Sequence, residues 1–253
     1  FGSVVANNAI NMELREGEIL SLLGENGSGK TTLMNMLSGI YYPDEGQIFV
    51  DGKEVEIRSP KDAFDLHIGM IHQHFKLVDV FTAAENIILG LPGDKGKMDK
   101  NAVAKAVREI ADRYGFDIDP NQKIYEMSVS QKQTVEIVKV LYRGADILIL
   151  DEPTAVLTPQ ETEKLFTVMR NMKKDGKAII IITHKLYEVM AISDRVGVMR
   201  KGRRIGVENT CDVDEKKLAS MMVGRPVLYD RLEKTGEAGA EQIRVSGLIV
   251  CDD

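Results

Sequence analysis

Gly24 to Thr31 form a glycine-rich segment whose residue types and spacing fit the binding of a phosphate chain. The segment reads GENGSGKT and lies between a strand-like apolar run and a helical pattern, which is the order expected for G-x-x-x-x-G-K-[ST], the Walker A pattern. Glycines let backbone N–H groups turn inward around phosphate oxygens, and the helix that follows adds the positive end of its dipole. The alternative, a glycine-rich turn that binds nothing, is disfavoured because both letters and context match.

Side chains in this segment have predicted roles in ATP binding and catalysis. Lys30 is expected to reach the β and γ phosphates, and the Thr31 hydroxyl is expected to help hold Mg²⁺. The residues predicted to contact ATP here are Gly24, Glu25, Asn26, Gly27, Ser28, Gly29, Lys30, Thr31 and Thr32.

Two adjacent carboxylates, Asp151 and Glu152, follow the apolar run 147–150. Such a run predicts a buried strand, and ligands bind at the carboxyl ends of strands in open α/β sheets. We expect Asp151 to contact Mg²⁺ through water and Glu152 to polarise the attacking water as a general base. Alone, the pair would fit an ordinary solvated acidic turn. Together with the phosphate loop it predicts ATP hydrolysis.

Alternating strand and helix patterns surround these residues and predict an α/β domain with a mostly parallel, buried sheet. Expected strands cover 18–23, 68–73, 146–150, 177–183, 195–200 and 203–207, and expected helices begin at 30, 59, 158 and 214. A hairpin is expected over 47–57, with its turn at Asp51-Gly52.

The segment from 82 to 141 is different, because its patterns are nearly all helical. Helices are expected over 82–89, 99–114 and 131–141, which indicates a helical insertion in the α/β domain. After Arg225 the composition becomes polar and rich in glycine, as in a linker, and a further strand is expected over 242–250.

Composition narrows the function classes. With 253 residues and a net charge of −6, the chain lacks the basic balance typical of nucleic-acid binding. Its longest apolar run is far shorter than the roughly 20 residues of a membrane span. Cys211 and Cys251 lie far apart, so neither a disulfide framework nor a zinc site is indicated. His72 and His74 flank Gln73, but a zinc site needs more ligands, and ordinary strand residues are the favoured interpretation.

Together with further motifs, these features resemble the ATP-binding cassette (ABC) ATPases over almost the entire chain. Gln73 matches a glutamine that in the family touches Mg²⁺ and the attacking water. His184 matches a histidine that contacts the γ phosphate, and 155–158 matches a loop between paired cassettes. MSVSQ, residues 127–131, stands where the family has its LSGGQ signature.

This resemblance implies a P-loop NTPase with a mostly parallel core sheet, an antiparallel β subdomain and a helical subdomain at about 78–144, within a nucleotide-binding domain over 1–225. Lys30, Gln73, Glu152 and His184 are then the expected catalytic residues, and Thr31, Gln73 and Asp151 the expected Mg²⁺ contacts. Phe1 is at the spacing of an aromatic residue that stacks on adenine.

Three longer stretches narrow the resemblance to importers for simple sugars and nucleosides, in which two cassettes are fused: IGMIHQHFKLV, TAAENIILG and GADILILDEPTAVLTPQE. On this interpretation, 226–253 is a linker and the first strand of a second cassette, and the first strand of this cassette precedes Phe1.

The resemblance also implies partners and a location. These are the second cassette, transmembrane permease subunits contacted near Val80 and Phe81, and indirectly a solute-binding protein; the location is cytoplasmic, peripheral on the inner face of the membrane. Two alternatives stay open: a soluble ABC ATPase acting on nucleic acid or ribosomes, and a regulatory cassette with little turnover. The sequence does not specify the transported solute.

The signature contains one departure from the family pattern. By resemblance, Ser128, Val129, Ser130 and Gln131 would face the ATP bound by the second cassette, but Ser130 replaces a glycine. Its Cβ either crowds the close approach to phosphate or costs on the order of 1 kcal/mol if a positive φ is required. Thr134 also stands where the family commonly has arginine. We expect the ATP site that uses this signature to be the slower of the two; the alternative is that serine is tolerated.

Overall fold

A computed structural model describes residues 5–91, 100–226 and 246–247. The predictions for Phe1 and for the strand over 242–250 fall at least partly outside these residues, as does nearly all of the predicted linker. Within the described part, a six-stranded sheet has the order β4-β5-β6-β1-β7-β8, and β2 and β3 form a separate hairpin. The strands are β1 (Ile19–Leu23), β2 (Ile48–Val50), β3 (Lys53–Val55), β4 (Ile68–Ile71), β5 (Ile147–Asp151), β6 (Ala178–Thr183), β7 (Arg195–Arg200) and β8 (Arg203–Asn209).

The central strands are parallel and buried, as the long apolar runs predict. Within the six-stranded sheet, β4, β5, β6, β1 and β7 pair in parallel and only the β7–β8 pair is antiparallel, while the separate β2–β3 hairpin is antiparallel. Helices cover both faces of the sheet, so neighbouring residues of one strand enter different cores. In β5, Leu148 and Leu150 pack with Phe166 on one face, while Ile149 packs with Met34 on the other.

The seven predicted helices are all present in the described residues, in the expected order, and a further helix, Leu186–Ile192, was not predicted. The helices are α1 (Lys30–Leu37), α2 (Pro60–Asp65), α3 (Ala83–Ile88), α4 (Lys100–Tyr114), α5 (Val129–Tyr142), α6 (Pro159–Lys174), α7 (Leu186–Ile192) and α8 (Glu215–Val223), with short 3₁₀ turns η1 (Ile124–Glu126) and η2 (Thr210–Asp212). The predicted hairpin turn carries positive φ angles at Asp51 and Gly52.

Two of the differences between predicted and observed boundaries concern candidate site residues. The strand expected to reach Gln73 ends at Ile71, which releases Gln73 from the sheet. The helix expected from Gln131 begins at Val129 instead, because Ser128 and Gln131 form a reciprocal capping box at its start. Residues 129–131 of the signature therefore belong to the first turn of this helix, and Ser128 is its N-cap.

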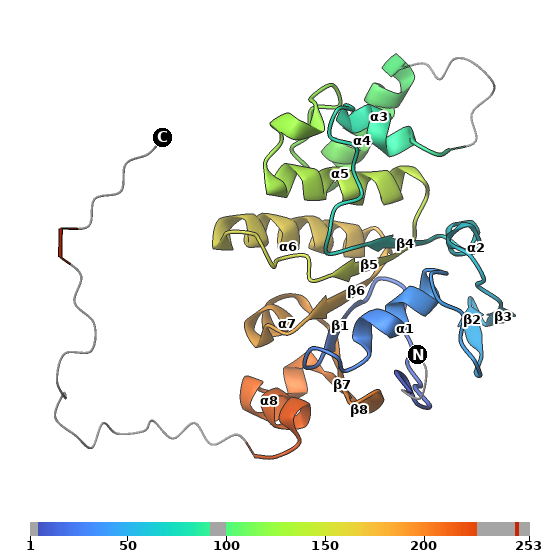
Figure 1. The fold of residues 1–253 in the computed structure, drawn as a ribbon, viewed down its shortest axis with the longest axis vertical. Helices are drawn as coiled ribbons and strands as arrows, with labels where there is room; N and C mark the ends of the chain where they lie inside the picture. The colour runs from blue at the N-terminus through green and yellow to red at the C-terminus, as the bar shows by residue number, and fades with distance from the viewer. Residues whose placement is uncertain (1–4, 92–99, 227–245, 248–253) are drawn as a thin grey trace.

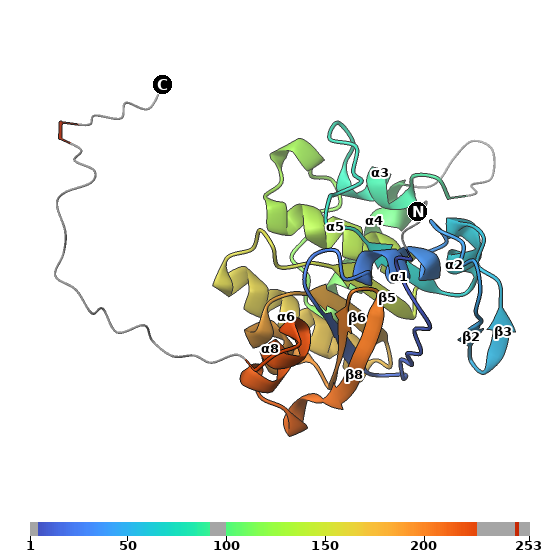
Figure 2. The same cartoon turned by 60° about the horizontal axis from the view of Figure 1, so that its bottom comes forward.

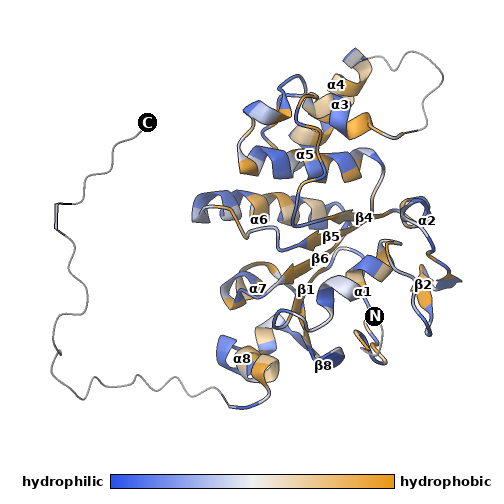
Figure 3. Cartoon of the chain, in the orientation of Figure 1, coloured by the Kyte–Doolittle hydropathy of each residue, from blue (hydrophilic) through white to orange (hydrophobic). Residues whose placement is uncertain are grey.

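α3, α4 and α5 gather beyond the β4 edge of the sheet, as Figures 1 and 2 show from two directions. They enclose their own apolar cluster, which includes Ile87, Val107, Ile124 and Val138. Figure 3 shows the contrast with the strands: these helices alternate polar and apolar residues, whereas the central strands are mostly apolar. Only one stripe of each helix is thus buried.

Among the described residues, none of the helices combines the length and apolar character that crossing a membrane would require.

Candidate active site

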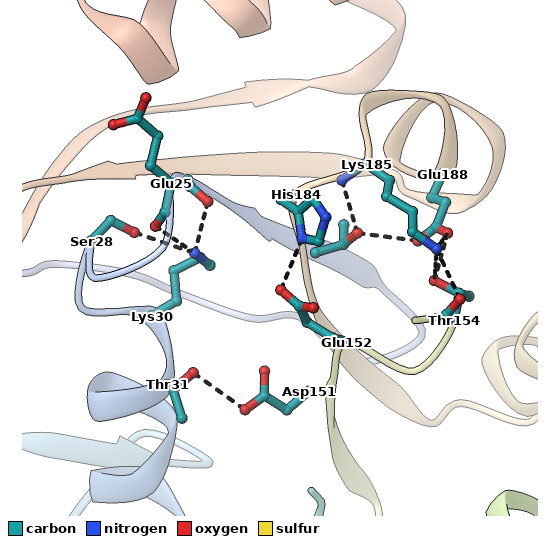
Figure 4. Close-up of polar contacts among 12 residues, drawn as sticks. Glu25, Ser28, Lys30, Thr31, Asp151, Glu152, Thr154, His184, Lys185 and Glu188 are labelled. Atoms are coloured by element: carbon teal, nitrogen blue, oxygen red, sulfur yellow. Dashed lines mark hydrogen bonds and ion pairs between the residues drawn. The ribbon is translucent and has the colours of Figure 1, made fainter. Parts of the chain in front are cut away.

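The phosphate loop is the turn between β1 and α1 (Figure 4). Gly27 has a φ of 77° and Gly29 a φ of 97°, conformations that side-chain-bearing residues rarely adopt. Gly24 is required for a different reason, because a Cβ there would collide with the Met199 carbonyl. The backbone thus forms the tight cradle that the glycine spacing predicts.

Lys30 lies in this cradle and is only 5% exposed. Its Nζ donates hydrogen bonds to the carbonyl oxygens of Gly24 (2.8 Å) and Glu25 (3.0 Å), and it lies 3.4 Å from the Ser28 hydroxyl. Burial lowers the pKa of Lys30, although the nearby carboxylates oppose this shift. The loop's own carbonyl oxygens thus hold the ammonium group.

Thr31 and Asp151 come from distant parts of the chain and meet beside the loop. The Thr31 hydroxyl donates a hydrogen bond to Asp151 Oδ2 at 3.2 Å. Asp151 is 8% exposed, and burial raises its pKa, while the bond from Thr31 acts in the opposite direction. A hydroxyl and a carboxylate are hard oxygen donors of the kind that Mg²⁺ prefers, so this pair fits the predicted metal.

Glu152 and His184 also face each other, from the ends of neighbouring strands (Figure 4). His184 Nδ1 lies 2.9 Å from Glu152 Oε1. Glu152 has a φ of 47°, which is unusual for a residue with a side chain, and its backbone N–H donates to the Ile182 carbonyl at 2.9 Å. The carboxylate is therefore presented by a turn whose conformation the neighbouring strand helps to hold.

Gln73 lies at the edge of the same region. It lines a hollow together with Asp151, Glu152, Pro153 and Gln133. His72 lines it too, and burial lowers the pKa of that imidazole. The residues predicted for chemistry thus converge from the phosphate loop and from the ends of β4, β5 and β6.

The predicted signature residues lie apart, at the start of α5. Ser128 Oγ accepts a hydrogen bond from the Gln131 N–H (3.2 Å), and Gln131 Oε1 accepts one from the Ser128 N–H (2.9 Å). Ser130 is in the first turn of this helix and is not among the positive-φ residues. The positive-φ explanation for a glycine there is therefore wrong for this conformation. Crowding by the Cβ and simple tolerance of serine are the two alternatives that remain.

Sequence reasoning missed a buried polar group beside Glu152. It contains Thr154, Thr183 and Glu188, with Lys185 at its edge. Gln133, on α5, was also missed; its amide donates to the Pro153 carbonyl at 2.6 Å. The sequence carries a weak signal for Glu188, which lies four residues after His184.

The same family was found by comparison with known proteins. Residues 7–155 match the family described as ABC transporter. Solved cassettes share the fold: the ADP conformation of MJ1267, an ATP-binding cassette of an ABC transporter, aligns with a TM-score of 0.78 and 25% identity over 89% of this chain and 95% of that one. CbiO1 of Clostridium perfringens, part of the ABC transporter complex cbiONQ, aligns with a TM-score of 0.72 and 32% identity over 87% and 88%.

Curated relatives are more similar in sequence. The guanosine import ATP-binding protein NupO of Bacillus subtilis is 52% identical over 100% of this chain and 50% of the relative. The nucleoside import ATP-binding protein NupA of Lactococcus lactis is 53% identical over 90% and 46%, and the ribose import ATP-binding protein RbsA 1 of Streptomyces avermitilis is 42% identical over 98% and 48%. The chain spans about half the length of these relatives. It belongs to the ATP-binding proteins of the ABC transporter family.

Proposed function

We propose that this chain binds ATP at the phosphate loop and hydrolyses it to drive import of a solute. The observation that carries the proposal is the convergence of Lys30, the Thr31–Asp151 pair and the Glu152–His184 pair at one end of the sheet. A phosphate-binding cradle, a site for a divalent cation and a paired carboxylate are the parts that phosphoryl transfer to water needs.

Each residue then has a role. Loop N–H groups from Gly24 to Thr32 hold the phosphates, and Lys30 exchanges its carbonyl partners for phosphate oxygens. Thr31, Asp151 and Gln73 hold Mg²⁺, which offsets the negative charge of the phosphates when it is bound. Glu152 accepts the proton of the attacking water. His184 orients Glu152 and contacts the γ phosphate.

The transported solute is a nucleoside in this proposal. The relatives named for guanosine and nucleoside import are 52% and 53% identical to the chain, whereas the ribose import relative is 42% identical. Because the chain spans about half of each relative, we propose a second cassette in the same polypeptide. The signature residues 128–131 would complete the ATP site of that cassette.

A membrane permease is the other proposed partner and would place the protein on the inner face of the cell membrane. Val80 is 65% exposed and Val78 36%, in the segment that leads into α3. Phe81, predicted as a contact beside them, is half-buried. These apolar side chains would receive the permease, and a solute-binding protein would deliver the nucleoside to it.

Replacing Glu152 tests the hydrolytic assignment. Glu152→Gln keeps the size of the side chain but removes its basicity, so ATP turnover of the full-length protein should fall by about 100-fold or more while ATP still binds. Steady-state turnover and calorimetric titration with ATP measure the two quantities. Undiminished turnover would overturn the assignment of Glu152 as general base, and no turnover by the wild-type protein would favour the regulatory alternative.

The solute is tested separately. Deleting the gene for the full-length protein should abolish uptake of radiolabelled nucleoside and leave ribose uptake intact. Restoring that gene should recover nucleoside uptake. Loss of ribose uptake alone would overturn the nucleoside assignment and favour a sugar.

A further inference from the structure

A buried polar cluster lies between the turn after Glu152 and the strand end before His184. Its members Thr154, Thr183 and Glu188 are 2%, 2% and 1% exposed. None of them touches phosphate in the proposed mechanism. A carboxylate this deeply buried is costly unless its oxygens are paired, so the arrangement around it needs an explanation.

Both oxygens of Glu188 have partners. Oε1 accepts hydrogen bonds from the Thr154 hydroxyl (2.5 Å) and the Tyr187 hydroxyl (3.1 Å), and it forms an ion pair with Lys185 Nζ at 3.1 Å. Oε2 accepts from the Thr183 hydroxyl at 3.1 Å. One side chain on α7 is therefore bonded to the end of β6 and to the turn that follows β5.

Lys185 strengthens the link to that turn. Its Nζ donates to the Thr154 carbonyl (2.8 Å) and to the Thr154 hydroxyl (3.2 Å). From the opposite side, the amide of Gln133 donates to the preceding carbonyl, that of Pro153. Two successive carbonyls, those of Pro153 and Thr154, thus accept hydrogen bonds from side chains on α5 and at the start of α7. Figure 4 shows the bonds from Lys185 to Thr154.

The turn held by these bonds directly follows Glu152 and sets the position of its carboxylate. A φ of 47° at Glu152 is unfavourable for a residue with a Cβ and persists only where the surroundings enforce it. His184 is fixed in the same way, because it directly follows Thr183 and precedes Lys185. The cluster therefore joins the two backbone segments whose side chains meet at 2.9 Å.

We propose that Glu188 is a positioning residue that, through Thr154 and Lys185, holds the Glu152 carboxylate against His184 in the geometry needed for hydrolysis. It contacts neither ATP nor the attacking water. The inference rests on the proposed function, because it assigns Glu188 an effect on turnover. Misplacement of a catalytic group by about 1 Å lowers rates by about 100-fold, so a small relaxation of this turn suffices.

The test compares variants in the full-length protein. Glu188→Ala removes the bonds of this carboxylate to Thr154, Thr183, Tyr187 and Lys185. Lys185→Met removes the bonds of the ammonium group to Thr154 and Glu188. Both should lower kcat by roughly 10- to 100-fold and leave KM for ATP unchanged. Glu188→Gln keeps an acceptor for Thr154 and should retain more turnover than Glu188→Ala.

Glu18→Ala is the matched control. Glu18 is also buried, 5% exposed, and paired with Arg195 at 3.1 Å, but it lies at the opposite end of β1 from the phosphate loop. Both Glu18→Ala and Glu188→Ala should unfold at a lower temperature than the wild type, but Glu18→Ala should keep the wild-type kcat below that temperature. Thermal unfolding of every variant fixes the temperature at which turnover is compared.

The outcomes separate the two proposals. Normal wild-type turnover with unchanged kcat in both Glu188→Ala and Lys185→Met would overturn the positioning role alone, as would an equal loss of kcat in Glu18→Ala. A rise in KM with unchanged kcat would also overturn it. Absence of wild-type turnover would overturn the proposed function, and the positioning role with it.

Discussion

The phosphate-loop region and the signature turn are both predicted to bind the same kind of ligand, but the chain builds them differently. Lys30 and Asp151 are buried, and Asp151 bonds to Thr31, 120 positions away in sequence. Ser128 is exposed, and its capping bonds reach only Gln131, three residues along. The fold therefore assembles the first region from distant segments, whereas the second is a local turn that offers its surface outward.

The two regions also differ in their buried charges. Burial lowers the pKa of Lys30 and raises that of Asp151, so both charged forms are disfavoured in the folded chain. Phosphates and a divalent cation would supply the missing counter-charges. The signature turn has no comparable buried charge. ATP is thus expected to interact strongly with the first region in this chain alone, and with the second only when another cassette presents it.

The largest expected effect follows Lys30→Met. The charge-assisted bonds of Lys30 to phosphate are lost, and with about 1.5–3 kcal/mol for each bond to a charged group, the Kd for ATP should rise by about 100-fold. Calorimetric titration of the chain measures it. Lys105→Met on the exposed surface of α4 is the control and should leave the Kd unchanged; an equal weakening there would point to loss of net charge as the cause.

Ser128→Ala is expected to have a smaller effect, on stability and on turnover of the full-length protein. Loss of an N-cap costs about 1 kcal/mol of stability, while ATP binding by the chain alone should not change. Turnover of the full-length protein should fall, because the signature hydroxyl would be absent from the partner's ATP site. Chemical denaturation, titration and turnover assays give the three values.

The control for Ser128→Ala is Asp214→Ala, which removes the cap of α8 at a site without a proposed role in ATP binding. It should cost similar stability and leave turnover intact. If Ser128→Ala weakened ATP binding by the isolated chain, the division between the two regions would be wrong.

The same division explains what could be predicted from the sequence. The fold follows from apolar runs and glycine positions, and contiguous letters predict Gly24 to Thr31 and the Asp151–Glu152 pair. The positive φ of Glu152 and the bonds of Glu188 depend on contacts between β5, β6 and α7, which no local pattern encodes. The start of α5 was misplaced by two residues because the capping box uses Gln131, which the signature pattern assigns to ligand contact.

A gain in stability is expected for Asp151→Asn in the absence of ATP. The pKa of Asp151 is raised, so the folded state keeps a proton that the unfolded state has lost, and stability falls as pH rises from 3.8 through the folded pKa. Asparagine removes this cost. At pH 7 we expect the Tm to rise by about 2–4 °C, equivalent to about 1 kcal/mol for a chain of this size.

Calorimetry at several pH values checks the sign for Asp151→Asn. The gain should vanish below pH 3.8, where the carboxyl is protonated in both states. Asp117→Asn, at an exposed position, should show no such gain. A lower Tm for Asp151→Asn at pH 7 would mean that the Thr31 bond outweighs the desolvation of the carboxylate.

The smallest effect on the folded chain is expected for Ser130→Gly, and it distinguishes crowding from tolerance at the signature. Ser130 lies in the first turn of α5 without a positive φ, so glycine brings no conformational relief and costs about 0.5 kcal/mol or less through lower helix propensity. Ala102→Gly near the start of α4 should cost more, up to about 1 kcal/mol, because alanine has the higher helix propensity. If the Ser130 Cβ hinders the approach of the partner's phosphate, turnover of the full-length protein should rise several-fold in Ser130→Gly, although the helix becomes less stable.

A fall in stability together with a rise in turnover would show that Ser130 slows hydrolysis at the surface that this chain offers to a second cassette, and not through the stability of its own fold. An unchanged rate would mean that serine does not limit turnover, and the expected difference between the two ATP sites would lose its support.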